Sequence, residues 1–161
     1  MKKLRTKFII FMYENSQKQY RKYFKKKKRQ WQFNEEQLLS FKQDSLGRTL
    51  GEFYKNHGFR MIPKMENHDV YHLITDCSTN IQDEIAMQYL LFGNGKRSAY
   101  LLGVLALGTI VFPEYFKNYL QAFKKGQQMK TFHHWNFEEL LWQNFDTLKD
   151  FIKQKETPVF Y

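Results

Sequence analysis

The 161-residue sequence has one cysteine and no apolar run long enough to cross a membrane. The single cysteine, Cys77, excludes an internal disulfide and is typical of a protein in a reducing compartment. The most apolar stretch, residues 99–112, has fourteen residues without a charge and would form about 21 Å of helix. A membrane span needs about 20 such residues, so we expect this stretch to form a central buried helix instead.

Strict alternation of apolar and polar residues, the signal of a half-buried strand, is missing from the sequence. Internal repeats and Gly-rich phosphate-binding loops are missing as well. Hydrophobic residues make up 42% of the chain, enough for one core at this length. The sequence therefore predicts an all-α fold, a single-domain bundle of about seven helices.

Acidic residues are almost missing from one end of the chain. Residues 1–29 contain twelve Lys or Arg against a single acid, Glu14, whereas the remainder contains fourteen against fifteen. A basic end on a neutral body favours an anionic lipid surface as partner, and nucleic acid comes second. We therefore divide the chain into a basic, helical N-terminal segment at residues 1–32 and a helical domain at residues 33–161.

The basic segment opens like a signal peptide, but its apolar core covers only residues 8–13 and no cleavage site follows. We expect the chain to stay inside the cell, in the cytoplasm, with peripheral attachment to a membrane. Aromatic residues recur beside the lysines at helical spacing, which is typical of an interfacial helix. A solvated helix that packs these aromatics on the body is the alternative.

Capping residues and glycines indicate where helices begin and end. Asn34 is followed three residues later by a glutamine, which predicts a capping box. Ser45 is expected to cap the next helix, and Gly58 to end it. Gly126 is expected to end the helix that follows the apolar residues 99–112.

The sequence His-Asp-Val-Tyr-His at residues 68–72 places three potential metal ligands on one helix. At about 100° per residue, His68, Asp69 and His72 fall within an arc of about 100°. Val70 and Ile74 lie on the opposite side, so the three polar residues could also form the solvated face of an amphipathic helix. The pattern alone fits both interpretations.

Glu84 favours the metal site. It follows His72 after eleven residues, in a second predicted helix at residues 81–92, where Ile81, Met87 and Leu91 flank it. A carboxylate in an apolar stripe stays ionised only when it is paired or binds a cation. Two imidazoles and two carboxylates suit Zn²⁺, and two histidines with a carboxylate also suit Fe²⁺.

Two enzyme classes have related motifs. In HExxH peptidases a glutamate acts as general base, but the equivalent residue here is Asp69, which is shorter, and this argues against a peptidase. HD-type phosphohydrolases need a further upstream histidine and a downstream aspartate. His57 could supply the first, although it lies only eleven residues before His68. This class remains an alternative.

The motif HDxxH-x11-E at residues 68–84 resembles that of a known family, as do the stretch LGRTLGEFY at residues 46–54 and the sequence HGF at residues 57–59. The family is the coenzyme Q (ubiquinone) biosynthesis family whose yeast founder is the fourth COQ protein. The resemblance runs from about residue 46 to residue 112. It weakens through the C-terminal third and leaves the first thirty residues uncovered.

This resemblance implies an all-α fold, membrane association, dimerisation and a role at the C1 carbon of a polyprenylated benzoquinone precursor. It also implies a Zn²⁺ held by His68, Asp69, His72 and Glu84. Family members are treated both as scaffolds and as catalysts of C1 decarboxylation and hydroxylation. A metal-dependent decarboxylase (lyase) and a lipid-binding scaffold with a structural metal therefore both stay open. In either case the expected partners are a polyprenylated quinone precursor or another isoprenoid lipid, and a second copy of the chain.

Three further residues are expected to contact the substrate. Arg48 lies four residues before Glu52, and most such pairs are solvated, but its place in the resembling stretch favours a position facing the ligand pocket. Leu102 and Gly103 lie in the apolar stretch, where a glycine allows close approach of a lipid tail.

Deleting residues 1–29 should leave a folded, metal-loaded domain that has lost its attraction to anionic membranes, because all the excess charge lies there. Each Lys or Arg near such a surface contributes about 1 kcal/mol, and the effect decays over roughly 8 Å at physiological salt. Vesicle sedimentation of both forms, at low and high salt, with anionic and neutral lipid, measures the loss. Equal sedimentation would reject the anchor, and tighter binding to RNA than to anionic vesicles would favour nucleic acid as the partner.

Overall fold

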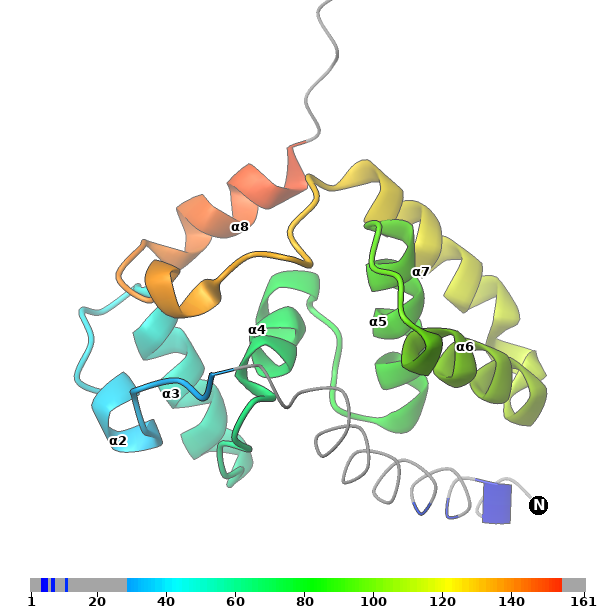
Figure 1. Cartoon of the computed structure of the whole chain (residues 1–161), viewed down its shortest axis with the longest axis horizontal. Coiled ribbons are helices and arrows are strands. Elements are labelled where there is room, and N and C mark those ends of the chain that lie inside the picture. Colours follow the sequence, from blue (N-terminus) through cyan, green and yellow to red (C-terminus); the bar gives the residue numbers. More distant parts are fainter. Residues whose placement is uncertain (1–3, 6, 8–10, 12–28, 155–161) are drawn as a thin grey trace, which may run out of the picture. The chain divides into compact units, whose positions relative to one another are not determined.

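The computed structural model describes residues 4–5, 7, 11 and 29–154 (Figure 1). Within these residues the regular elements are seven α-helices and two short 3-10 helices, and the only bridge between extended residues joins Ser45 and Asn144. The predicted all-α fold is confirmed. Most of the predicted interfacial helix lies outside the described residues.

Cα packing divides the chain into two compact units, and each is built from two segments. The α5–α7 unit joins Met1–Arg29 with Cys77–Gln127, and the α4 unit joins Gln30–Asp76 with Gln128–Tyr161. The first contains α5 (Ile81–Gly93), α6 (Ala99–Val111), η1 (Pro113–Tyr115) and nearly all of α7 (Phe116–Gln128). The second contains α2 (Glu35–Leu38), α3 (Leu46–His57), α4 (Glu66–Thr75), η2 (Phe137–Leu140) and α8 (Phe145–Lys153).

Local capping fixes where several helices begin. Asn34 takes part in the predicted capping box at the start of α2. The Ser45 side chain caps α3, which ends at Gly58 in the left-handed conformation, with φ of 64°. Asn80 caps α5 in the same way as Ser45 caps α3. Asn34, Ser45 and Gly58 agree with the sequence predictions, because capping depends only on neighbouring residues.

Gly126 does not end its helix, and that prediction is wrong. The helix α7 continues to Gln128, and Gly126 lies against α5, where a Cβ atom would come 2.0 Å from the carbonyl oxygen of Leu90. A Cβ at Gly93 would lie equally close to the carbonyl oxygen of Phe123. Both glycines allow two backbones to approach closely, a use that the sequence pattern does not separate from helix termination.

The helix α6 is not a central buried helix, contrary to the prediction. Its buried residues Leu101, Leu105 and Gly108 lie on one side, and a Cβ at Gly108 would come 2.7 Å from the Ile85 side chain of α5. The opposite side is exposed, although it is equally free of charge. The absence of charged residues led to the prediction that the whole helix is buried, whereas only the face that contacts α5 is buried.

In the α4 unit, aromatic side chains cover the apolar face of α4. The Tyr71 ring lies 5.8 Å from that of Phe132 and 6.0 Å from that of Phe137, and its hydroxyl donates a hydrogen bond to the carbonyl of His133 at 2.7 Å. Val70 is also fully buried. This packing places the polar residues of α4 on the remaining faces of the helix.

Candidate metal centre

His68 and His72 lie one turn apart on α4. Their ring centroids are 5.0 Å apart with planes at 85°, and one nitrogen of each ring lies within 4.8 Å of one nitrogen of the other. Since Zn–N bonds are about 2.0–2.1 Å long, modest side-chain rotation would let both nitrogens bind one ion. The two imidazoles therefore fit a shared metal ion.

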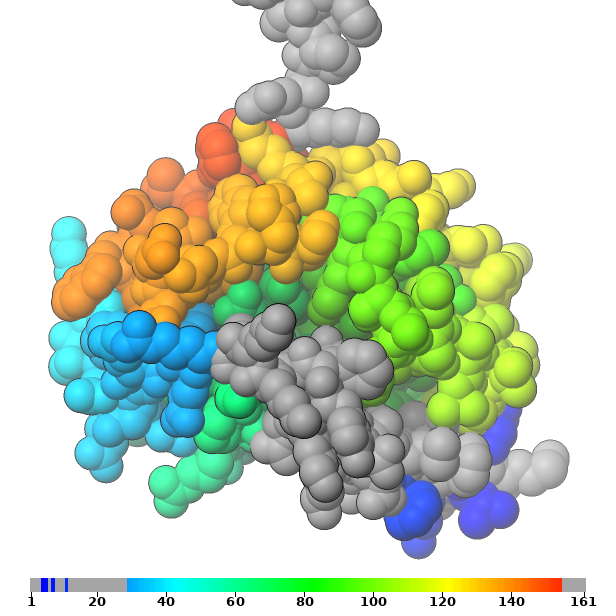
Figure 2. Space-filling model, viewed as in Figure 1, coloured from blue at the N-terminus to red at the C-terminus, as the bar shows by residue number. Residues whose placement is uncertain are grey.

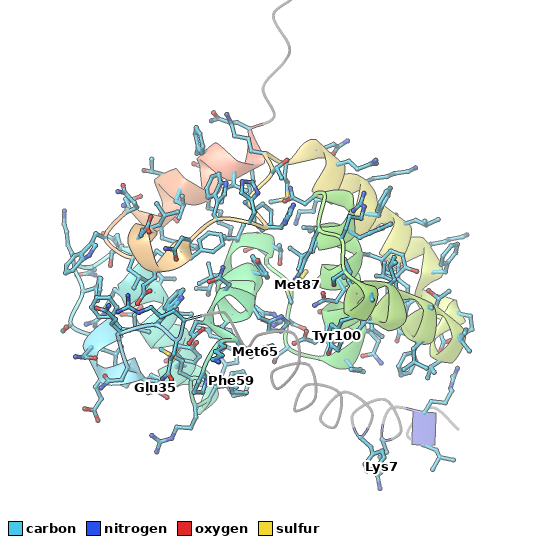
Figure 3. The ribbon with its side chains drawn as sticks, in the orientation of Figure 1. Lys7, Glu35, Phe59, Met65, Met87 and Tyr100 are labelled. Atoms are coloured by element: carbon cyan, nitrogen blue, oxygen red, sulfur yellow. The ribbon has the colours of Figure 1, made fainter. Side chains whose placement is uncertain are left out.

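An aromatic wall, formed by Phe53, His57 and Phe59, adjoins His72. The Phe53 ring stacks on the buried His72 ring at 6.1 Å and 17°. Phe53 also lies 4.5 Å from the ring of His57 and 5.9 Å from that of Phe59, which Figure 3 labels near the loop into α4. The wall gives His72 aromatic surroundings on this side.

Asp69 is held by a tyrosine from the neighbouring helix. The Tyr54 hydroxyl, almost fully buried on α3, donates a hydrogen bond of 2.7 Å to Oδ2 of Asp69. Burial raises the pKa of Tyr54 far above its usual value, and the negative charge of Asp69 raises it further. Tyr54 therefore keeps its proton at neutral pH and acts as a permanent donor to Asp69.

The predicted ligands do not all meet within the α4 unit. The two imidazoles come within 4.8 Å of each other, and neither Asp69 nor His57 joins them in such a cluster of described residues. His57 lies at the exposed end of α3, with its Nδ1 atom 2.8 Å from the carbonyl oxygen of Phe53. Asp69 stays a predicted ligand, and its observed contact is with Tyr54.

Glu84 lies in the first turn of α5, in the α5–α7 unit. It is partly buried, and Met87 and Leu91 on the same helix are fully buried. The expected apolar surroundings are therefore present on its own helix. Its role as a metal ligand stays a prediction.

The predicted substrate-binding residues have different surroundings. Arg48 donates through Nε to Oε1 of Glu52 at 2.7 Å and through Nη1 to the carbonyl of Leu39, so it ties α3 to the end of α2. Leu102 and Gly103 lie on the exposed face of α6, and a Cβ at Gly103 would meet no atom within 4 Å. Contact of these three residues with substrate stays a prediction.

The buried polar residues that the sequence analysis did not predict include two with contacts beside the predicted site or at the start of α4. One is Tyr54, which donates to Asp69. The other is Glu66, whose fully buried carboxylate accepts hydrogen bonds through Oε1 from the backbone N–H groups of Lys64 at 2.8 Å and Trp31 at 3.3 Å. Helical spacing carries no signal for the contacts of Tyr54 with Asp69 and of Trp31 with Glu66, because each joins separate segments.

The family model described as coenzyme Q (ubiquinone) biosynthesis protein Coq4 matches residues 55–158. Solved structures of similar fold include a crystal structure, from Nostoc punctiforme, of a protein described as a candidate ubiquinone biosynthesis protein. It superimposes with a TM-score of 0.63 at 16% identity, over 78% of this chain and 70% of that one. At this identity the likeness shows the fold alone. Comparison with curated proteins gives no match.

Replacing His72 with alanine should remove most of the bound metal, because a single imidazole would remain on α4. His57→Ala is the matched control, since it removes an imidazole from the same unit and should leave the metal content unchanged. Elemental analysis of the purified proteins measures both. Equal metal in wild type and His72→Ala would refute the site, and loss of metal in His57→Ala would favour the phosphohydrolase alternative.

Tyr54→Phe should weaken metal binding about 10- to 100-fold, because partners that orient a ligand commonly contribute that much. Tyr71→Phe is the control, since it also removes a buried hydroxyl from the α4 unit, but one that donates to a backbone carbonyl. Competition with a metal-binding dye gives the dissociation constants. The same loss in both variants would mean that Tyr54 acts through general stability and does not orient Asp69.

Proposed function

This chain belongs to the coenzyme Q (ubiquinone) biosynthesis protein Coq4 family, which supports a role in ubiquinone biosynthesis, and we propose that it acts there as a metal-binding component that handles a polyprenylated aromatic acid. The observation that carries the proposal is the family match over residues 55–158, since it includes the whole HDxxH-x11-E motif. The step at the C1 carbon of the ring is the reaction that we assign to it.

The proposed ligands are His68, Asp69, His72 and Glu84, with Zn²⁺ as the metal and Fe²⁺ as the alternative. The spacing of the two imidazoles supports the proposal, as does the buried donor that fixes Asp69. When bound, such an ion supplies Lewis acidity toward a carboxylate or phenolate oxygen.

The surroundings of the two histidines suit an aromatic substrate. The aromatic wall combines the Phe53 ring, stacked on His72, with Phe59, which is 42% exposed. A substrate ring that packs on the wall would adopt an offset-stacked or edge-to-face arrangement, because aromatic pairs prefer these geometries. The ring would lie in apolar surroundings beside the two imidazoles, where charge on its carboxylate is poorly screened by water.

A lipid-binding scaffold with a structural metal is the second candidate. The exposed apolar face of α6 favours it, because such a face suits attachment to a lipid membrane. An open coordination position would favour the catalyst, and a ligand shell completed by the protein would favour the scaffold. The partners that we propose are an isoprenoid lipid, a second copy of the chain and, through residues 1–29, an anionic membrane surface.

Lipid mass spectrometry on the purified protein tests the proposed function. A polyprenylated aromatic acid should copurify with the wild type or bind when added. Phe59→Ser should reduce the recovered lipid several-fold by removing part of the aromatic wall. Phe151→Ser is the control, because Phe151 is also an exposed aromatic, at 48%, in the same unit.

Release of CO₂ from the added acid by the metal-loaded protein separates the two candidates, since only the catalyst should release it. Binding without release supports the scaffold. A wild-type protein that neither retains nor binds any polyprenylated aromatic acid would refute both.

A further inference from the structure

The outer face of α6 consists of exposed residues without a single polar side chain. They are Ala99, Leu102, Gly103, Ala106 and Ile110, and the last is 76% exposed. No single helix among the described residues is long and apolar enough to span a membrane, and α6 passes that test only together with residues 113–128, at a bend of 104°. We call these five residues the α6 outer face. A continuous apolar face of this kind marks an interaction surface.

The described N-terminal residues extend this apolar surface. Leu4, Arg5, Lys7, Phe11, Ile110 and Val111 line an open groove of about 650 Å³. Figure 2 shows the N-terminal residues in blue beside the end of α6, and Figure 3 labels Lys7, which is exposed. Leu4 and Phe11 are exposed as well, so apolar side chains and an exposed cation gather at one end of the α6 outer face.

Arg5 joins the N-terminal residues to the end of α6 and to η1. Its Nη1 donates to the carbonyl of Val111 at 2.9 Å, and its guanidinium pairs with the Glu114 carboxylate at 3.0 Å. The same guanidinium lies 5.7 Å from the centre of the Phe112 ring. The end of the basic segment is therefore joined to α6 by specific contacts and not by apolar packing alone.

Charge is divided unequally between the two units. Among the described residues, the segments of the α5–α7 unit contain eight Lys or Arg against three Asp or Glu, or +5, whereas those of the α4 unit contain eight against eleven, or −3. The unit that carries the α6 outer face is therefore the basic one. An apolar face on a basic unit suits a surface that is apolar inside and anionic outside.

We propose that the α6 outer face and its adjoining groove dock on an anionic lipid bilayer. Leu102, Ala106 and Ile110 enter the boundary between headgroups and acyl chains, Leu4 and Phe11 enter beside them, and Lys7 contacts lipid phosphates. This inference rests on the proposed function, which gives the protein a membrane-borne substrate, and adds the surface by which it meets the membrane. As a helix, α6 is about 20 Å long and lies in the plane of the interface.

A second copy of the chain is a poorer occupant of this face. In a symmetric dimer the same patch of each copy meets the other, so two basic units would be brought together. Like charges across an interface oppose association, whereas anionic headgroups attract the same charges. The charge of the unit therefore favours an anionic bilayer over a second copy of the chain as the occupant of this face.

The test uses the full-length protein and vesicles of phosphatidylcholine with or without phosphatidylserine, at low and high salt. Ile110→Asp should reduce binding to the anionic vesicles about tenfold at high salt, where apolar contacts dominate. Trp142→Asp is the matched control, because Trp142 is 66% exposed and lies in the other unit, and it should bind like the wild type. Gly103→Leu should strengthen binding, because its side chain meets no atom of the protein.

A tryptophan at the face reports insertion directly. The three native tryptophans all lie in the segments of the α4 unit, so Ile110→Trp should add fluorescence that bromine-labelled acyl chains quench. Ile110→Asp binding as tightly as the wild type at high salt, without such quenching in Ile110→Trp, would overturn the proposal. Conversion of a dimer to a monomer by Ile110→Asp, with vesicle binding unchanged, would overturn it in favour of a protein interface.

Metal content and recovered polyprenylated acid are measured on the same preparations. If Ile110→Asp keeps both and loses only vesicle binding, the docking surface is supported apart from the proposed function. If the wild type binds vesicles through this face but holds neither metal nor polyprenylated acid, the docking surface stands and the proposed function fails.

Discussion

The buried carboxylate of Glu66 joins the segment at Trp31 to the loop that leads into α4. Its Oε1 atom accepts the backbone N–H groups of Trp31 and Lys64, and the helix that it begins has no side-chain cap at Met65. A carboxylate removed from water needs such donors, because loss of one leaves a buried charge that costs several kcal/mol. The position of α4, and hence of His68 two residues later, depends on these bonds.

The sequence could predict what depends on near neighbours. Asn34 and Ser45 cap helices as expected, and the polar residues of α4 lie away from its apolar face, because capping and helical spacing are local properties. The sequence could not predict that Gly126 packs against α5 or that Tyr54 donates to Asp69, since both need knowledge of which helices are neighbours. The resemblance weakened in the C-terminal third, whereas the family match continues to residue 158.

The two units differ in what they contribute. The α4 unit supplies the paired imidazoles, the tyrosine that donates to Asp69 and the aromatic wall. The two segments that form this unit have a slightly negative net charge. The α5–α7 unit supplies the excess positive charge and a helix with one exposed apolar face. Recognition of a polar head and contact with lipid would thus fall to separate parts of one chain, and Glu84 belongs to the second of them.

The two glycine contacts between α5 and α7 set the rotation of α5 about its own axis. Gly93 and Gly126 are each pressed against a carbonyl of the other helix, so sliding by one residue would drive a side chain into backbone. Glu84 lies nine residues before Gly93, or about 180° around the helix, and therefore points away from α7. The packing of Gly93 against α7 thus leaves Glu84 near the other end of α5, on the side that faces away from α7. A Cβ atom at Gly93 would force α5 or α7 to shift, because it would come 2.0 Å from the carbonyl oxygen of Phe123.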